Sequence, residues 1–243
     1  MLAQLYHFHL NPYEEDLAFW LNLADQQGGP VLELGCGTGR VLLRLADSGY
    51  PVCGLENDPD MIAVLEARLE EGDYGEVEVH EADMTHFRIN KRFPLIIIPC
   101  NTYSTLTTEG RMGTLESATR HLSPGGVLAA SLPNPNWMAQ LPEEADPEIE
   151  TIFTHPYSGH PVQVSSAWQR NAGEVCVVMH YDHLLPDGRV DRISFSAGHH
   201  LTTYEHYLEE FGERGFKVRA YGDFEGTPYD SQSVYLNFVA TIL

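Results

Sequence analysis

The sequence predicts one α/β domain built on a mostly parallel sheet, with an antiparallel β insert late in the chain. Short apolar runs alternate with segments of helical period, which is typical of successive βα units. A glycine-rich turn follows the first apolar run, and prolines interrupt the pattern from Pro133 onward. With 243 residues, 43% of them apolar and 20% charged, the chain can bury a full core without a partner.

The first βα unit is built around the glycine-rich turn. Tyr13–Gln27 places its apolar residues on one helical stripe, and Val31–Leu34 is expected to be the first strand. The turn Gly35–Gly39 leads into a helix with apolar residues at helical spacing, which Gly49 ends. The chain therefore begins with a helix, a strand and a second helix.

Four further strands and two helices extend this pattern. The strands are expected at Pro51–Leu55, Val77–His80, Phe93–Pro99 and Val127–Leu132. Asp58 followed by Pro59 is a typical helix start, and Thr108 can cap the next helix. Leu95–Ile98 is continuously apolar, as expected of a strand that is buried on both faces.

A different pattern begins at Pro133. Repeated prolines exclude a long helix. We interpret the acidic stretch from Glu143 to Glu150 as a solvated loop rather than as a set of acids that attracts a cationic amine. Three strands joined by turn signals follow, which predicts an antiparallel meander. They are expected at Val162–Gln169, Glu174–Leu184 and Val190–Gly198.

The parallel pattern resumes after the insert. Thr202 and Glu205 form a capping pair for one more helix, and the strands Phe216–Tyr221 and Val234–Leu243 follow. We therefore divide the chain into a core at 1–132, the insert at 133–201 over the substrate pocket, and a completion of the core at 202–243.

The charge of the chain limits its partners. Fourteen Lys and Arg against 35 Asp and Glu give a net charge of -21, which repels phosphate backbones and anionic membrane surfaces. We expect neither nucleic acid nor a membrane as partner, and a monomer or homodimer as the assembly. The four cysteines form no CxxC pair, and the first residues resemble no signal peptide, so we expect reduced thiols and a cytoplasmic location.

The turn after the first strand has the properties of a ligand loop. Glycines at a strand-to-helix junction let the backbone approach a ligand closely. The GxGxxG spacing of dinucleotide sites fails, because Arg40 or Leu42 stands where the last glycine belongs. No Lys-Ser or Lys-Thr follows the loop, so a nucleoside triphosphate loop is absent as well. These exclusions favour an uncharged or cationic ligand.

Two acids and a methionine follow the next strands. Glu56 ends the second strand, where a carboxylate can accept hydrogen bonds from both hydroxyls of a ribose. Asp83 comes just after the third strand and can accept from the exocyclic amine of an adenine, while Met84 packs on the ring. The pattern predicts that the ligand contains a nucleoside, with Glu56 at its ribose and Asp83 at its base.

Five segments in this order carry a family resemblance: VLELGCGTGR, GLENDPDMI, EADMTHF, FPLIIIPCNTYSTL and LSPGGVLAASLP. They resemble the successive motifs of class I S-adenosylmethionine-dependent methyltransferases, over about Leu2–Leu132 and less specifically Thr202–Leu243. The resemblance implies a Rossmann-like methyltransferase fold, with a seven-stranded mixed sheet in the order 3-2-1-4-5-7-6 and helices on both faces. It also implies S-adenosylmethionine as cofactor.

The resemblance assigns the cofactor contacts residue by residue. Glu33 corresponds to the acid that contacts the amino acid part of the cofactor. Glu56 corresponds to the acid that binds the ribose, and Asp83 to the residue that binds the adenine. An aromatic N-terminal segment can close over the cofactor as a lid, although a simple packing stripe explains it equally well. The expected contacts are Tyr6, Glu33, Gly35, Cys36, Gly37, Gly39, Glu56, Asn57, Asp83, Met84, Cys100 and Asn101.

The segment after the fourth strand narrows the chemical class of methyl acceptor that we expect. PCNTYSTL and the antiparallel insert look most like the branch that methylates amines on small metabolites, amino sugars or amino acids. DNA adenine and amide enzymes of the family carry Pro-Pro and an aromatic after their Asn or Asp, whereas Thr102 and Tyr103 follow Asn101 here. We expect methyl transfer to a small-molecule amine by direct displacement, with alignment and exclusion of water lowering the barrier.

No residue of the sequence is a clear general base. The histidines His180, His199 and His200 of the insert, and Tyr103 after the fourth strand, are the candidates. Neighbouring histidines such as His199 and His200 point to opposite faces of a strand, so we expect no metal site. Two alternatives stay open: methylation of a hydroxyl or carboxylate oxygen, and a protein that binds S-adenosylmethionine without turnover.

Overall fold

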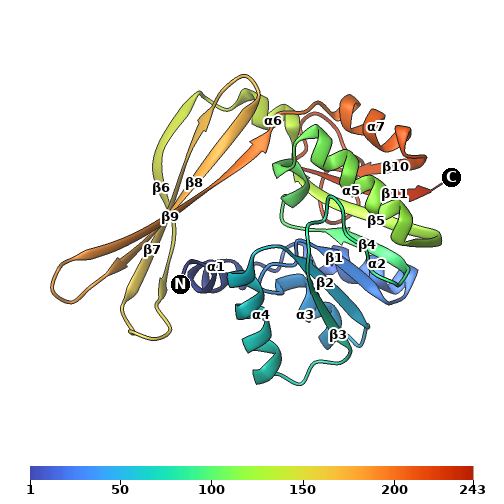
Figure 1. Ribbon diagram of the computed structural model, residues 1–243. Helices are drawn as coiled ribbons and strands as arrows, with labels where there is room; N and C mark the ends of the chain where they lie inside the picture. Colours follow the sequence, from blue (N-terminus) through green and yellow to red (C-terminus); the bar gives the residue numbers. More distant parts are fainter. Residues whose placement is uncertain (243) are drawn as a thin grey trace.

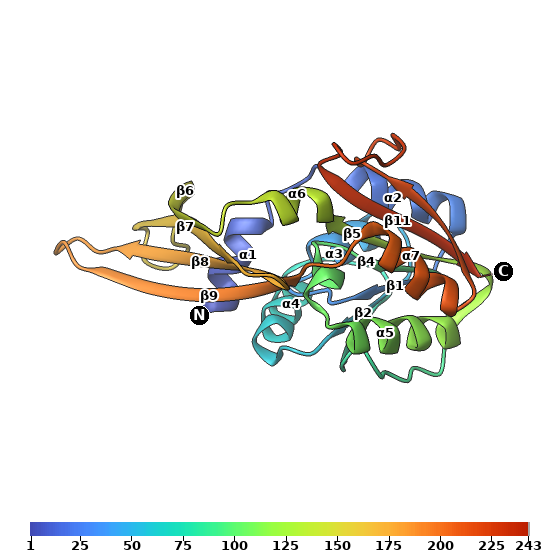
Figure 2. The ribbon, with the colours of Figure 1, turned by 90° about the horizontal axis from the view of Figure 1, so that it is seen from above.

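The computed structural model describes residues 1–242, and within them the chain forms a seven-stranded sheet and a four-stranded sheet. Figure 1 shows the four-stranded sheet standing to one side of the larger unit, and Figure 2 shows the same arrangement from above. Within this range, no helix combines the length and the apolar character needed to cross a bilayer.

The larger sheet has the strand order that the family resemblance implies. Its strands are β1 (Val31–Leu34), β2 (Val52–Glu56), β3 (Val77–Glu81), β4 (Phe93–Ile98), β5 (Leu122–Pro133), β10 (Phe216–Tyr221) and β11 (Tyr235–Ile242). Across residues 1–242 they lie in the order β10-β11-β5-β4-β1-β2-β3. β11 runs antiparallel to both of its neighbours, and the other pairs are parallel. The order reverses beside β1, where open α/β sheets bind ligands.

Helices cover both faces of this sheet. They are α1 (Leu2–Leu10), α2 (Leu17–Gln27), α3 (Arg40–Asp47), α4 (Pro59–Glu71), the 3-10 turn η1 (Thr102–Thr105), α5 (Thr108–His121), α6 (Pro135–Gln140) and α7 (Tyr204–Glu213). Leu32 on β1 packs in one buried cluster with residues of α5 and α7, whereas Val31 packs in another with residues of α2 and α3. Alternate residues of β1 are thus buried on opposite faces, which explains why its sequence reads as a continuous apolar run.

The smaller sheet is a meander of four long antiparallel strands, β6 (Glu144–Thr154), β7 (Pro161–Arg170), β8 (Glu174–Leu184) and β9 (Val190–His200). One face of it receives α1. Leu5 of that helix forms a small buried cluster with Val162, Val164 and Tyr181. The N-terminal helix therefore lies between the two sheets.

The structure differs from the sequence expectation near the N-terminus and at the start of the insert. The helix predicted over Tyr13–Gln27 begins at Leu17, and the separate helix α1 precedes it. The acidic stretch predicted as a loop is the edge strand β6. Register shifts between Ala145 and Glu148, and between Ile149 and Thr151, break the alternation that would have revealed this strand.

Helix caps differ from the expectation by one residue. The Thr107 hydroxyl, not that of Thr108, accepts from the backbone N–H of Gly110 and caps α5. At α7 the cap is Thr203 rather than Thr202. Adjacent threonines give equivalent sequence signals, so the backbone angles decide between them. The last strand runs from Tyr235 to Ile242, and Leu243 lies outside the described residues.

The structure corrects the position of Tyr103, one of the candidate bases. Its side chain is completely buried and packs against Tyr207 and Phe211 of α7, at ring-centroid distances of 6.1 and 5.9 Å. Its hydroxyl has no hydrogen-bond partner among the described residues. Burial raises the pKa of this phenol far above its ordinary value. Tyr103 is therefore a residue of the hydrophobic core.

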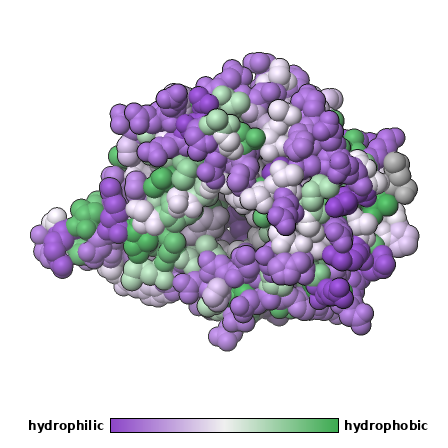
Figure 3. Space-filling view, turned by 45° about the horizontal axis from the view of Figure 1, so that its top comes forward, coloured by the Kyte–Doolittle hydropathy of each residue, from purple (hydrophilic) through white to green (hydrophobic). Residues whose placement is uncertain are grey.

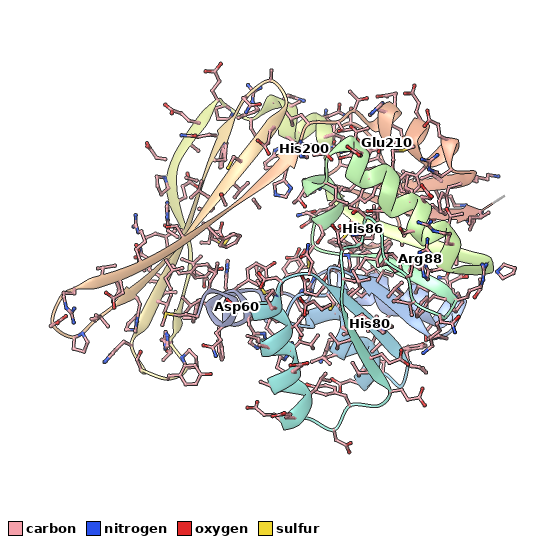
Figure 4. The ribbon with its side chains drawn as sticks, viewed as in Figure 1. Asp60, His80, His86, Arg88, His200 and Glu210 are labelled. Carbon is pink, nitrogen blue, oxygen red and sulfur yellow. The ribbon has the colours of Figure 1, made fainter. Side chains whose placement is uncertain are left out.

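A buried ion pair joins α5 to α7 beside this ring. Arg111 donates from Nε and Nη2 to the Glu210 carboxylate at 2.8 and 2.6 Å, and both side chains are almost fully buried. Figure 4 shows Glu210 on α7. A buried pair of this geometry fixes the helices in one register, because either charge alone would be buried without compensation.

We predict that Glu210→Ala lowers the free energy of unfolding by about 3–5 kcal/mol, because it leaves the Arg111 guanidinium buried and unpaired. Urea denaturation followed by circular dichroism measures this. Glu209→Ala, at an exposed position of the same helix, should stay within about 0.5 kcal/mol of the parent. Equal losses in both variants would contradict a special role for the pair.

Tyr103→Phe should leave stability unchanged or raise it by up to about 1 kcal/mol, because it removes a buried hydroxyl that makes no hydrogen bond. The rate of the catalysed reaction should also stay unchanged. Thermal unfolding and a turnover assay test the two parts separately. A rate loss of about tenfold or more, equivalent to 1.4 kcal/mol in the barrier, would return Tyr103 to the candidate bases.

Candidate functional site

The turn between β1 and α3 is glycine-rich for two separate reasons. Gly35, Gly37 and Gly39 all have positive φ angles, of 72, 54 and 82°. A Cβ at Gly39 would lie 2.5 Å from Leu65 Cδ1, so that glycine lets α4 pack against the turn. A Cβ at Gly37 would meet no atom of the described residues within 4 Å. Gly37 is thus the position where the backbone stays open to a ligand.

Cys36 can contribute only its backbone to this turn. Its side chain is buried, with 4% exposure, and points toward β2. A Cβ at Gly54 would come within 2.7 Å of the Cys36 sulfur, which explains the glycine at that position of β2. Any contact between Cys36 and a ligand therefore passes through its peptide group.

Glu33 is a buried acid with an unused oxygen. Only 3% of the residue is exposed, and its Oε2 has no hydrogen-bond partner among residues 1–242. Burial raises the pKa of this carboxyl well above its ordinary value, and the nearby Arg40 opposes the shift. A cationic ligand group beside Oε2 would satisfy the oxygen and stabilise its ionised form. The amino group of a methionine moiety fits this requirement.

The sequence does not reveal the ion pair of Arg40 and Asp16, which lies near Glu33. Arg40, the first residue of α3, donates to Asp16 Oδ1 and Oδ2 at 2.6 and 2.7 Å. Trp20 donates to the same carboxylate at 2.9 Å, and Arg40 Nη2 lies 3.0 Å from Cys100 Sγ. The network ties α2, α3 and the end of β4 together. The sequence signal for this network is the Arg in GTGR, at the position where a dinucleotide site would have its last glycine.

Glu56, at the end of β2, hydrogen-bonds to the glycine-rich turn Gly35–Gly39, which is called the ligand turn from here on. Its Oε2 accepts from the Gly37 N–H at 2.8 Å, and its Oε1 accepts from the N–H groups of Asn57 and Asp58 at 2.8 and 3.0 Å. A carboxylate has about four acceptor positions, so capacity for a ligand hydroxyl remains. The Asn57 side chain is exposed beside it. The ligand turn and this acid are therefore one hydrogen-bonded unit.

Asp83 and Met84 lie in the segment after β3. Asp83 accepts from the Thr85 N–H at 2.8 Å, and this bond together with the neighbouring His86 lowers the pKa of the carboxyl. The Asp83 side chain is 42% exposed and stays ionised. Met84 Cε would lie 3.1 Å from a Cβ on Gly35, so the methionine borders the ligand turn. Figure 4 shows His86 in the same segment.

Cys100 and Asn101 have an unusual backbone directly after β4. Both have positive φ angles, 58 and 61°, although neither is a glycine. Such residues cost conformational free energy and cluster at ligand sites. Cys100 is exposed, yet surrounding protein raises the pKa of its thiol, as expected on the wall of a recess. Figure 3 shows the surface hollowed between the four-stranded sheet and the larger unit.

The helix α1 connects this region to the four-stranded sheet. His7 Nδ1 lies 3.2 Å from Thr38 Oγ1 in the ligand turn, and burial lowers the pKa of His7 to about 4. The Tyr6 ring packs edge-on against Phe195 of β9 at 5.9 Å. Burial, with Cys100 nearby, raises the pKa of the Tyr6 phenol. Tyr6 therefore lies between the predicted cofactor residues and the insert, where a lid residue would lie.

The three candidate histidines divide between the faces of the four-stranded sheet. His199 shares a face with Tyr181, against which α1 packs, and its Nδ1 lies 2.8 Å from Ser104 Oγ. His180 and His200 have the opposite parity along their strands, so they lie on the other face of the four-stranded sheet. His180 contacts Ser194 at 2.6 Å. Of the three, His199 is the one on the face that receives α1.

His9 and Glu150 form a contact on the inner face that the sequence does not reveal, although each residue stands out in it separately. His9 of α1 lies 3.1 Å from the Tyr181 hydroxyl through Nδ1 and 3.4 Å from Glu150 Oε2 through Nε2. The His9 side chain is 8% exposed and that of Glu150 is 36% exposed. Within the acidic stretch, the Glu150 carboxylate thus lies on the inner face of the sheet. The bulge near Ile149 changes the face on which Glu150 lies.

Comparison with known proteins gives consistent matches. A methyltransferase domain model matches residues 31–126. The chain is similar to dTDP-3-amino-3,6-dideoxy-alpha-D-glucopyranose N,N-dimethyltransferase of Streptomyces fradiae, with 28% identity over 84% of this chain and 76% of that protein.

Solved structures match over nearly the whole chain. An S-adenosylmethionine-dependent methyltransferase from Clostridium acetobutylicum has a TM-score of 0.83 at 12% identity, over 98% of this chain and 97% of that one. S-adenosylmethionine-bound CalS10, an amino pentose methyltransferase from Micromonospora echinaspora, has a TM-score of 0.71 at 23% identity, over 94% and 89%. These likenesses establish the fold.

The matched domain begins at the first residue of β1 and contains the ligand turn, Glu33, Glu56 and the segment after β4. The strand order, the unpaired acid beside the open glycine and the domain match therefore agree on one cofactor. Residues 31–126 therefore match a methyltransferase domain, and the fold is that of S-adenosylmethionine-dependent methyltransferases, so the cofactor that this site supports is S-adenosylmethionine.

Proposed function

We propose that the chain methylates an amine nitrogen of a small molecule, with amino sugars as the first class to test. The observation that carries this proposal is the similarity over 84% of the chain to an N,N-dimethyltransferase that acts on an amino sugar nucleotide. The inner face of the insert supports it, because the Glu150 carboxylate lies on that face and suits a substrate that arrives as a cation.

The cofactor is proposed to lie with its amino group at Glu33, its ribose hydroxyls at Glu56 and its adenine between Asp83 and Met84. The peptide groups of Gly35, Cys36, Gly37 and Gly39 would border it, and Asn57, Cys100 and Asn101 would complete the walls. The sulfonium supplies an electrophilic methyl group. Tyr6, held against Phe195, would cover the reacting atoms and exclude water.

The acceptor must lose a proton for the reaction to balance. The nitrogen lone pair forms the bond to the methyl carbon, the carbon–sulfur bond breaks, and one proton leaves the nitrogen. His199 can receive that proton, because burial lowers its pKa and keeps its ring neutral near pH 7. The pair of His9 and Glu150 on the same face is a second route to solvent. Alignment of the atoms supplies the remaining rate enhancement.

The acceptor class is tested with labelled S-adenosylmethionine and matched sugars that carry either an amine or a hydroxyl at the same carbon. We expect label in the amine members alone, with a rate that rises with pH as more amine is neutral. Transfer to the hydroxyl members alone would support O-methylation instead. Binding of the cofactor without transfer to either set would support a non-catalytic binding protein.

Glu33→Gln should weaken S-adenosylmethionine binding by at least about tenfold, because a hydrogen bond to a charged group contributes about 1.5–3 kcal/mol. The ligand-free protein should not lose stability, since an amide is easier to bury than a carboxylate. Calorimetric titration and thermal unfolding measure the two effects. Glu81→Gln, at an exposed position of β3, is the matched control. An unchanged dissociation constant in Glu33→Gln would contradict the assignment.

A further inference from the structure

Three metal-ligand side chains meet at the outer edge of the seven-stranded sheet, away from the hollow. Cys53 of β2 and Glu78 and His80 of β3 place one donor atom each within 4.8 Å of one another. Figure 4 shows His80 on β3. Cys53 is directly opposite Glu78 in the parallel register, and His80 is opposite Leu55. The three side chains therefore share one face of the sheet.

The environment of these groups has an unexplained feature. His80 Nε2 is shielded from solvent and has no hydrogen-bond partner among the described residues, and the nearest acid oxygen, on Glu78, is 3.8 Å away. A buried imidazole nitrogen without a partner costs free energy, and a bound ion would remove that cost. The Glu78 side chain is 53% exposed, so solvent reaches the cluster from its side.

The donor set and its spacing fit a tetrahedral transition metal. Thiolate, imidazole and carboxylate are the ligands of protein zinc sites. At zinc–ligand distances of about 2.0–2.3 Å, two tetrahedral ligands lie roughly 3.3–3.7 Å apart. The donor atoms lie within 4.8 Å of one another, so they would move closer together around an ion, and water would take the fourth position from the exposed Glu78 side.

The Glu78 carboxylate has a cationic partner on its exposed side. Lys91 donates to Glu78 Oε1 at 3.0 Å. The Cys53 side chain is completely buried. An incoming dication would replace the Lys91 contact at Glu78 and release the thiol proton to solvent.

We propose that Cys53, Glu78 and His80 bind a divalent transition metal of the zinc type, which ties the edge strand β3 to β2. The placement has a consequence for the cofactor side. Glu56 ends β2 and Asp83 follows β3, so both acids stand a few residues beyond the ligands on the same two strands. The metal clip would hold these strands in one register and restrict the separation of the two carboxylates.

The test titrates chelator-treated protein with Co²⁺ and records its absorption spectrum. A sulfur-to-cobalt charge-transfer band, with visible bands typical of tetrahedral cobalt, should saturate at one ion per chain and disappear when Zn²⁺ is added. Because the band requires a thiolate ligand, weak binding to the surface among the twelve histidines does not produce it.

Variants locate the site. Cys53→Ser and His80→Gln should abolish or weaken the band at least tenfold, whereas Cys176→Ser in the insert and His86→Gln should not change it. His80 is partly exposed, so His80→Gln gives a folded test even if the buried Cys53→Ser variant unfolds. The proposal is overturned if the parent protein shows no charge-transfer band, or if folded His80→Gln keeps the parental band and affinity.

Discussion

The end of β1 depends on an imbalance of buried charge. Two carboxyl groups, Glu33 and Asp16, lie beside a single guanidinium, that of Arg40, and Asp16 uses that guanidinium in two short hydrogen bonds. Glu33 is left as an acid whose ionised form is poorly solvated. A cofactor that carries positive charge would pair with the Glu33 carboxylate. The site therefore favours a cationic ligand group at the end of β1. The glycine-rich turn Gly35–Gly39 then has only to leave space for the cofactor.

The same network determines how the rest of the molecule is arranged. Arg40 joins α2 to α3 and reaches Cys100, where two left-handed residues turn the chain sharply out of β4. That turn leads into η1, whose Ser104 contacts His199 of the insert. The helix α1 makes a second connection, through His7 to the ligand turn and through His9 to Tyr181. The insert is therefore held against the cofactor region from two sides.

Much of this arrangement was predictable because it follows from local periodicity and turn chemistry. The ligand turn and the candidate acids follow from motifs in which glycine or an acid stands at a strand end, and the strand order follows from the family resemblance that these motifs carry. Other features depend on long-range geometry. The inward direction of Glu150 depends on a bulge, the burial of Tyr103 depends on the left-handed pair before it, and the ion pair of Arg40 depends on a helix far away in sequence. No pattern within a short window contains that information.

The edge strand β6 has one more consequence, which concerns how copies of the chain behave toward each other. An open strand edge invites pairing with another chain, and natural sheets counter this with charge, proline and bulges. β6 has all three: Pro147, two register shifts and a row of acids from Glu144 to Glu150. The residues that concealed this strand from pattern-based prediction are thus the ones that discourage growth of the sheet by strand addition.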